Sequence, residues 1–160
     1  MRRVHAYQWV GSYGAKTNVA ANASVAWAMV LHTADTTDDI ILRVHGSWSW
    51  NPANALVNGA EYTLGVGLYI ADARAVTAGV ASLPRPLQDW SEDWLMHMTV
   101  AACHGAVTDF GIHQFPFDSK AKRKFSADEK LCFIVENAAA SSGTVQVIPT
   151  IRLLGKERGT

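Results

Sequence analysis

The sequence predicts an all-β protein, and three observations lead to that prediction. Segments rich in Val, Ile, Thr and aromatic residues recur along the chain, and Gly, Pro, Asn or Asp bounds each of them. Polar and apolar residues alternate in stretches such as "SWSW" (47–50), with the two-residue period of a pleated strand. No helical segments alternate with the strands, so we expect antiparallel pairing in a sandwich or a barrel.

The first three internal strands are separated by clear turn signals. "SVAWAMVLHTA" (24–34) is an apolar run of strand length that ends at "TTDD". "IILRVHGSWSW" (40–50) begins with β-branched residues and ends in the alternating stretch. The turn-rich "NPANALVNGA" separates it from "EYTLGVGLYIA" (61–71), whose "GVG" is too short for a phosphate loop.

The segment after the third strand has a different pattern. "DARAVTAGVA" (72–81) predicts one short helix, with Asp72 as its N-cap and Pro84 and Pro86 beyond its end. Strand patterns then resume in four segments, 93–103, 115–125, 130–138 and 144–156. One further strand is expected near "VHAYQWV" (4–10), which gives about eight strands in total.

Length and charge bound the organisation of the chain. With 160 residues and no linker or repeat, we expect a single domain over 1–160, with residues 1–12 as a short N-terminal extension. Lys plus Arg and Asp plus Glu both number 14, so no net charge draws the protein to nucleic acid. No apolar run approaches the ~20 residues that span a bilayer, and "MRRVHAYQWVGSYG" has no apolar core of a secretory signal.

Signatures of catalysis are absent from the sequence, so we expect no enzyme, no cofactor and no catalytic residue. There is no GxSxG, HExxH or P-loop pattern, and no GxGxxG between a strand and a helix. The histidines that several strands could gather into a metal site are His45, His97, His104 and His113. No His-x-His or His-x-Asp/Glu pair accompanies them, so we expect no metal.

The two cysteines predict buried thiols. Cys103 and Cys132 lie in apolar strand segments without CxxC spacing, and we expect both to be free. Cys103 next to His104 has the composition of a nucleophile pair, but adjacent strand residues point to opposite faces.

Six tryptophans are a high count for one small domain. Core filling or a subunit contact is the favoured interpretation, and an aromatic platform that stacks on sugars or bases is the alternative. The residues concerned are Trp27, Trp48, Trp50, Trp90 and Trp94.

The basic run "DSKAKRKF" has two distinct faces if it is a strand. Lys120, Lys122 and Lys124 share one face. Ala121, Arg123 and Phe125 share the other. A solvated strand face is the favoured interpretation, and a weak phosphate-binding patch joined by Arg2 and Arg3 is the alternative. Arg123 then faces inward and needs a carboxylate partner, for which the candidates are Asp118, Asp128 and Glu129.

The order of these segments resembles a known family. "ILRVHGSWSW" leads into the Gly-rich "YTLGVGLYIAD", and "GVASLPRPLQD" leads into the Trp-rich "DWSEDWLMHM". The basic "KAKRKFSADEKLCFIVEN" and the last strand "VQVIPTIRLL" complete the series. Over about 24–155 the chain is similar to the single jelly-roll coat proteins of small viruses and phages, known mainly from environmental sequences.

The resemblance implies a single antiparallel jelly-roll sandwich with at most one short helix. It also implies a virion structural protein that is assembled in the host cell. Copies of this protein would form a shell, and icosahedral symmetry is one arrangement that such shells adopt. Coat proteins of this kind often carry a long basic arm, where this chain has "MRR", so we expect at most weak, non-specific contact with nucleic acid.

The segment "DWSEDWLMHM" is a candidate surface for self-assembly through apolar contacts between the sides of neighbouring subunits. Its bulky apolar residues exceed what the inner face of one strand usually takes, and obligate interfaces are rich in aromatic residues and Met. The predicted subunit interface comprises Trp90, Trp94, Met96 and Met98.

Three alternatives to a shell protein remain open from the sequence. A head decoration protein would bind other capsid proteins and assemble only on their lattice. A carbohydrate-binding sandwich would be a monomer with an aromatic groove, and a cupin-like metalloenzyme would hold a bound metal.

Overall fold

A computed structural model describes residues 6–13, 17–22, 25–33, 40–53, 60–72, 76–77, 80–81, 85–87, 94–104, 113–119, 123–126 and 129–158. Every regular element in these ranges is a β-strand, and the predicted all-β class is confirmed. Among these residues there is no helix of the length and hydropathy needed to cross a membrane.

Twelve strands are defined in the described ranges. They are β1 (Ala6–Tyr13), β2 (Thr17–Val19), β3 (Trp27–Thr33), β4 (Ile40–Pro52), β5 (Ala60–Asp72), β6 (Val76–Thr77), β7 (Val80–Ala81), β8 (Trp94–His104), β9 (His113–Ser119), β10 (Arg123–Lys124), β11 (Glu129–Asn137) and β12 (Val145–Arg158).

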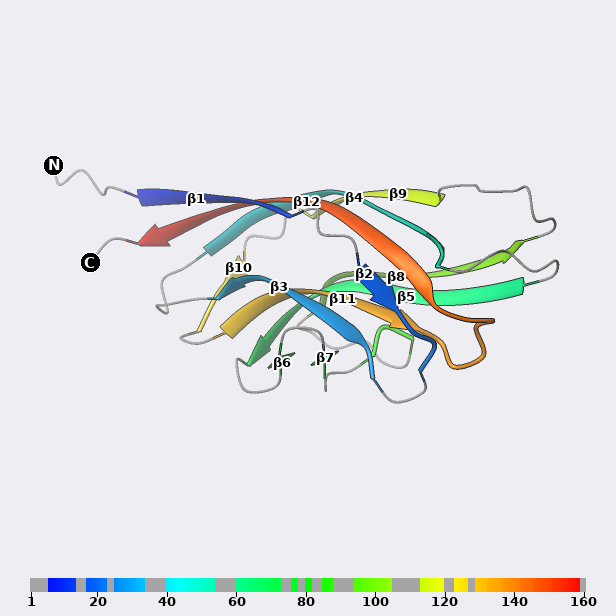
Figure 1. The fold of residues 1–160 in the computed structure, drawn as a ribbon. Helices are drawn as coiled ribbons and strands as arrows, with labels where there is room; N and C mark the ends of the chain where they lie inside the picture. The colour runs from blue at the N-terminus through cyan, green and yellow to red at the C-terminus, as the bar shows by residue number, and fades with distance from the viewer. Residues whose placement is uncertain are drawn as a thin grey trace, which may run out of the picture.

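Two antiparallel sheets form the layers of a sandwich (Figure 1). The six-stranded sheet has the order β1-β12-β4-β10, with β2 also on β12 and β9 also on β4. The four-stranded sheet has the order β3-β11-β5-β8. The pairs are nested along the chain, since β2 pairs with β12, β3 with β11, β4 with β9, and β5 with β8. This double-sheet arrangement confirms the predicted jelly-roll sandwich.

The core lies between the sheets and follows the alternation of the strands. On β5 and β11, Leu64, Val66, Leu68 and Phe133 are fully buried at 0% exposure. Trp48 and Trp50 enter the same core from β4, with 0% and 1% exposure. The opposite residues of β4, such as Ser47 and Ser49, lie on the other face of the strand, as "SWSW" predicts.

One glycine of β4 is required by the backbone. Gly46 has φ = +151°, and a Cβ there would lie 1.9 Å from the carbonyl oxygen of Thr150 on β12. Only glycine tolerates both the conformation and this close approach of two strands.

The expected helix over 72–81 is wrong. Asp72 is the last residue of β5, and the described part of the following segment pairs Val76 with Ala81 and Thr77 with Val80 in the β6–β7 ladder. Ala-rich composition is a weak prior that local pairing and packing override.

Two other boundaries differ from those predicted. The segment 115–125 contains two strands, β9 on Val44–Trp50 and β10 on Ile40–Ile41, both paired with β4. The stretch expected as an extension, residues 1–12, is strand β1 from Ala6 onward, and β1 borders the six-stranded sheet through its pairing with β12.

Candidate assembly surfaces

The four-stranded sheet buries apolar residues on both faces. Beside the core face, a second apolar cluster covers the side that points away from the six-stranded sheet. It comprises Ala26, Ala28, Tyr69, Ala71, Trp94, Cys132 and Ile134, each 8% exposed or less. β6 and β7 lie beneath this sheet in Figure 1, on that same side. The connection between β5 and β8 therefore contributes to a third layer.

Two glycines of β5 provide the space that this outer layer occupies. A Cβ on Gly67 would lie 2.2 Å from the ring of Trp94, which packs edge-on against Tyr69 at a centroid distance of 4.7 Å. A Cβ on Gly65 would lie 2.8 Å from the Cβ of Pro86. The "GVG" pattern therefore serves packing, because only glycine lets these rings approach the strand.

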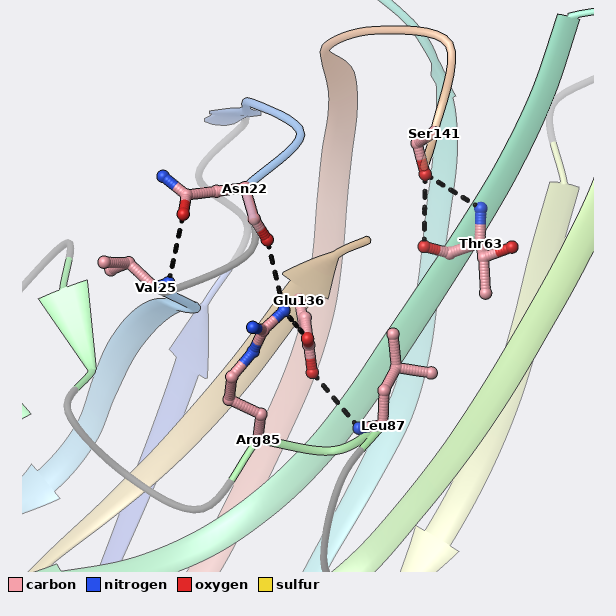
Figure 2. A network of polar contacts seen from close by, with 7 residues as sticks. All are labelled: Asn22, Val25, Thr63, Arg85, Leu87, Glu136 and Ser141. Carbon is pink, nitrogen blue, oxygen red and sulfur yellow. Dashed lines mark hydrogen bonds and ion pairs between the residues drawn. The ribbon is translucent and has the colours of Figure 1, made fainter. Parts of the chain in front are cut away.

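A buried ion pair fixes the outer layer to the sheet (Figure 2). Arg85, 8% exposed, pairs through Nη2 with Oε1 of Glu136, which is 1% exposed on β11. The backbone N–H of Leu87 donates to Oε2 of Glu136 at 3.1 Å, and Arg85 Nη2 donates to the carbonyl oxygen of Asn22 at 3.1 Å. Burial lowers the pKa of Arg85 from its ordinary value. The carboxylate of Glu136 thus joins β11 to the 85–87 segment, and Arg85 links that segment to the loop after β2.

Further polar contacts fix the turn between β11 and β12. Asn137, fully buried, donates from Nδ2 to the carbonyl oxygens of Val19 and Gly143, both at 2.9 Å. The N–H of Thr63 on β5 donates to Ser141 Oγ at 3.0 Å (Figure 2). These hydrogen bonds join the end of β11 to β2, and the turn before β12 to β5.

The exposed side chains that the structure describes on the outer face of the six-stranded sheet are polar. Exposed residues there include Arg43, Thr150 and Arg152, and Arg43 makes a two-pronged pair with Asp118 of β9. The Nε–Oδ1 and Nη2–Oδ2 distances are 2.9 and 2.8 Å. Asp118 raises the pKa of Arg43, by hydrogen bonding first and by charge second. Such a face fits solvent rather than a dry contact.

The β8–β9 side of the sandwich combines core packing with partial exposure. β8 is a terminal strand of its sheet and pairs with β5. The partly buried residues here that pack against the main core are Leu95, Met96, Met98, Val100 and Phe117. They give this side an apolar rim whose side chains remain partly exposed.

The predicted interface residues fall on different surfaces. Trp94 packs in the outer cluster of its own chain, while Met96 and Met98 lie at the β8 rim. Trp90 lies outside the described residues. Whether these residues contact another subunit stays a prediction, and Met96 and Met98 have more exposed surface to offer than Trp94.

Of the basic run, the structure describes the C-terminal part, which begins at Arg123. Lys124 is exposed on β10 and Phe125 is 2% exposed, as the alternation predicts. Arg2, Arg3, Lys120 and Lys122 lie outside the described residues, so their contact with nucleic acid stays a prediction. Among the carboxylates proposed for Arg123, Asp118 pairs with Arg43, and Oε2 of Glu129 accepts from Ser126 N–H at 2.6 Å. Asp128 lies outside the described residues.

Strand register keeps the two cysteines apart. Cys132 lies opposite Tyr69 and Cys103 opposite Glu61, eight positions along β5, which is roughly 26 Å at about 3.3 Å per residue. A disulfide needs Cα atoms within about 7 Å. Cys132 is free and fully buried, and burial raises the pKa of its thiol to about 12. The side chain of Cys103 lies outside the described part.

The candidate metal ligands are not brought together where the structure describes them. His45 lies opposite Asp118 on the six-stranded sheet, whereas His97 lies opposite Gly67 on the four-stranded sheet. His104 and His113 lie opposite Ala60 and Trp50. The described residues contain no group of three or more His, Cys, Asp or Glu that could hold a metal ion.

The tryptophans proposed for an aromatic platform are not exposed where the structure describes their side chains. Trp48, Trp50 and Trp94 are buried, and Trp27 is partly buried against the core. The one exposed large apolar residue of the described part is Val25. It borders an open hollow of about 150 Å³ near Trp27, below the roughly 300 Å³ of small ligand sites.

Sequence reasoning missed the Arg85–Glu136 pair. The available signal was Glu136, a carboxylate in the otherwise apolar "LCFIVEN", because such a charge must find a partner when it is buried. The partner itself, between Pro84 and Pro86, carries no such signal.

Comparison with known proteins gives similarity of fold alone. No protein-family model and no curated protein matches the sequence. A structure of infectious bursal disease virus, Gx strain, is 14% identical with a TM-score of 0.38, covering 98% of this chain and 32% of that one. The chain therefore spans about a third of that protein's length.

Two other solved structures match over most of both chains. The acid-stable capsid of Helicobacter pylori bacteriophage KHP30 is 14% identical, with a TM-score of 0.38 and coverage of 96% of this chain and 95% of that one. Eiger TNF from S. frugiperda is 11% identical, with a TM-score of 0.44 and coverage of 97% and 94%. Similarity at TM-scores of 0.38 to 0.44 does not indicate a function for this chain.

Proposed function

We propose that this protein is a virion structural protein that forms a shell with copies of itself. The observation that carries the proposal is the nested jelly-roll pairing of β2–β12, β3–β11, β4–β9 and β5–β8. The order of sequence segments implies this topology through its resemblance to single jelly-roll coat proteins. Fold alone does not imply function, so the surfaces must also suit the role.

The packing of the chain suits a rigid building block. Each face of the four-stranded sheet carries a buried apolar cluster, and the Arg85–Glu136 pair fixes the outer layer to the sheet. A rigid subunit loses little conformational entropy on association, which favours assembly through modest contacts. The residues that we propose for these contacts are Met96 and Met98, with Trp90 and Trp94 beside them.

The proposal includes a weak, non-specific contact with nucleic acid. Lys124 is exposed, and we propose that Lys120, Lys122, Arg2 and Arg3 act with it. The location that follows is the virion, assembled in a host cell.

The mass of the purified protein tests the proposal. We expect sedimentation velocity and negative-stain microscopy to show closed particles far above the 17.4 kDa of one chain. A monomer at micromolar concentration across several salt and pH conditions would remove the shell-forming role. A decoration protein would behave in that way too, and would then bind a preformed capsid lattice.

A further inference from the structure

We infer that β8, which among the described strands pairs with β5 alone, uses its other edge to pair, antiparallel and about a two-fold axis, with β8 of a second copy of this chain. The inference rests on the proposed function for its choice of partner, and it names the contact that the assembly uses. A terminal strand presents unpaired backbone N–H and C=O groups, which another strand satisfies best.

The composition of β8 is unusual for an edge strand. Its 11 residues, "WLMHMTVAACH", contain no Lys, Arg, Asp, Glu, Pro or Gly. Natural edges usually carry a charge, a proline or a bulge that discourages pairing. β8 has one such feature, a bulge at Leu95 near its start, and its pairing with β5 is regular from Met96 to His104. The neighbouring edge strand β9 has such features, because it contains Pro116 and the Asp118 that pairs with Arg43.

The other two edges are less suited to pairing. β3 is in contact with β7, and His32 near its end packs on Phe125 at a centroid distance of 5.5 Å. β1 is uncharged but shorter, at 8 residues, and contains Gly11, which weakens a strand. Of the edges that the structure describes, β8 is the longest that lacks both a charge and a second neighbour.

A second copy fits this edge for two reasons. A two-fold contact sets each residue against a residue of the same strand, so an uncharged strand pairs with itself without like-charge repulsion. The partly exposed side chains on its core side, Met96, Met98 and Val100, would then continue across the contact and bury their remaining apolar surface.

Matching of apolar residues on the regular part of the strand sets the register. Beyond the bulge at Leu95, a pairing centred on Thr99 sets Thr99 opposite Thr99 and Met98 opposite Val100. The same register sets Met96 opposite Ala102, so both methionines meet apolar residues. Thr99 is exposed and lies opposite Gly65 of β5, on the face away from the core. It can therefore be changed without disturbing the core.

Charge reversal at Thr99 tests the pairing. Thr99→Lys and Thr99→Glu each set like charges against each other in the dimer, so each variant alone should lose the contact. An equimolar mixture of the two sets opposite charges together and should recover it. Sedimentation velocity measures the mass in all three samples, beside Thr150→Lys and Thr150→Glu, which place the same charges at an exposed position of β12.

The outcomes separate this inference from the proposed function. Loss of assembly in both Thr99 variants with recovery on mixing, and no effect at Thr150, is the expected result. A parent that forms a dimer but no shell would keep the β8 contact and remove the shell-forming role. Shells that persist in both Thr99 variants, or that fail to return on mixing, would overturn the Thr99-centred pairing and leave the shell-forming role intact.

Discussion

Two arginine–carboxylate pairs in this protein differ in burial and should differ in their contribution to stability. The side chains of Arg85 and Glu136 are 10% and 1% exposed, whereas those of Arg43 and Asp118 are 45% and 38% exposed. Removing one partner of a buried pair leaves an uncompensated charge away from water, which costs about 3–5 kcal/mol. An exposed pair is solvated and screened, so its loss matters much less.

We therefore expect Arg85→Met to lower the free energy of unfolding by about 3 kcal/mol, measured by urea denaturation. Adding Glu136→Gln should restore much of this loss, because it removes the buried charge and keeps an oxygen for the N–H of Leu87. Arg43→Met is the matched control and should change stability far less. Equal losses in the two single variants would contradict the assigned burial.

At this scale the sequence predicted side-chain direction better than side-chain partners. Trp48, Trp50 and Phe125 are buried where alternation places them. Predicting the partner of a side chain requires the register between strands that are far apart in the chain. A local sequence pattern does not contain this register. The pairing of Asp118 with Arg43 across the β4–β9 ladder is an example, because 75 residues separate the two in the sequence.

The elements are held by close approaches that a single methyl group would disturb. Gly67 on β5 lies directly under the ring of Trp94, where an added Cβ would lie 2.2 Å from the nearest ring carbon. A ring packed against Tyr69 cannot retreat without opening the outer cluster. Gly143, in the turn before β12, has no atom within 4 Å of the corresponding position.

Gly67→Ala should therefore destabilise the protein by about 1–3 kcal/mol, the usual cost of overpacking. Near-ultraviolet circular dichroism should report the displaced tryptophan, and thermal melts should give the loss of stability. Gly143→Ala makes the same chemical change without a clash and should melt close to the parent. If Gly67→Ala melted as high as Gly143→Ala, Trp94 could not occupy the position described.

Strands were predicted correctly where the two-residue periodicity and the flanking turn residues indicated the same boundaries. Strands of only two or three residues were missed. β4, β5, β8, β11 and β12 lie within a few residues of the predicted segments. β2 and the β6–β7 ladder have three and two residues per strand, too few for a period to appear. These short strands depend on packing against the larger sheets, as tertiary context often overrides propensity.

For the whole molecule, the nested pairing of the strands was predictable from the sequence only through the family resemblance. Periodicity indicates which residues face a core, but many strand orders bury the same faces. The structure adds the third layer on the four-stranded sheet, which no local pattern in 73–93 indicates. Physical reasoning from sequence therefore reached the class of fold, and the resemblance supplied its topology.

With 14 basic and 14 acidic residues, the molecule as a whole has no net charge, so any affinity for nucleic acid must arise from a local patch. The proposed patch is Lys120, Lys122 and Lys124, of which Lys124 is exposed on β10. Replacing all three by Gln should weaken binding about equally for every nucleic-acid sequence. It should also flatten the dependence of log affinity on log salt by about 0.9 per lost phosphate contact on duplex DNA.

Filter binding across a salt series measures this slope, and thermal melts show whether the fold is intact. Arg152→Gln removes one exposed cation from the outer face of the same sheet, opposite His45, and controls for a general loss of charge. Binding that is unchanged in the triple variant, or lost equally in Arg152→Gln, would contradict the patch. A parent protein with no salt-dependent binding would leave the basic run as a solvated strand face, since phosphate contacts necessarily release counterions when they form.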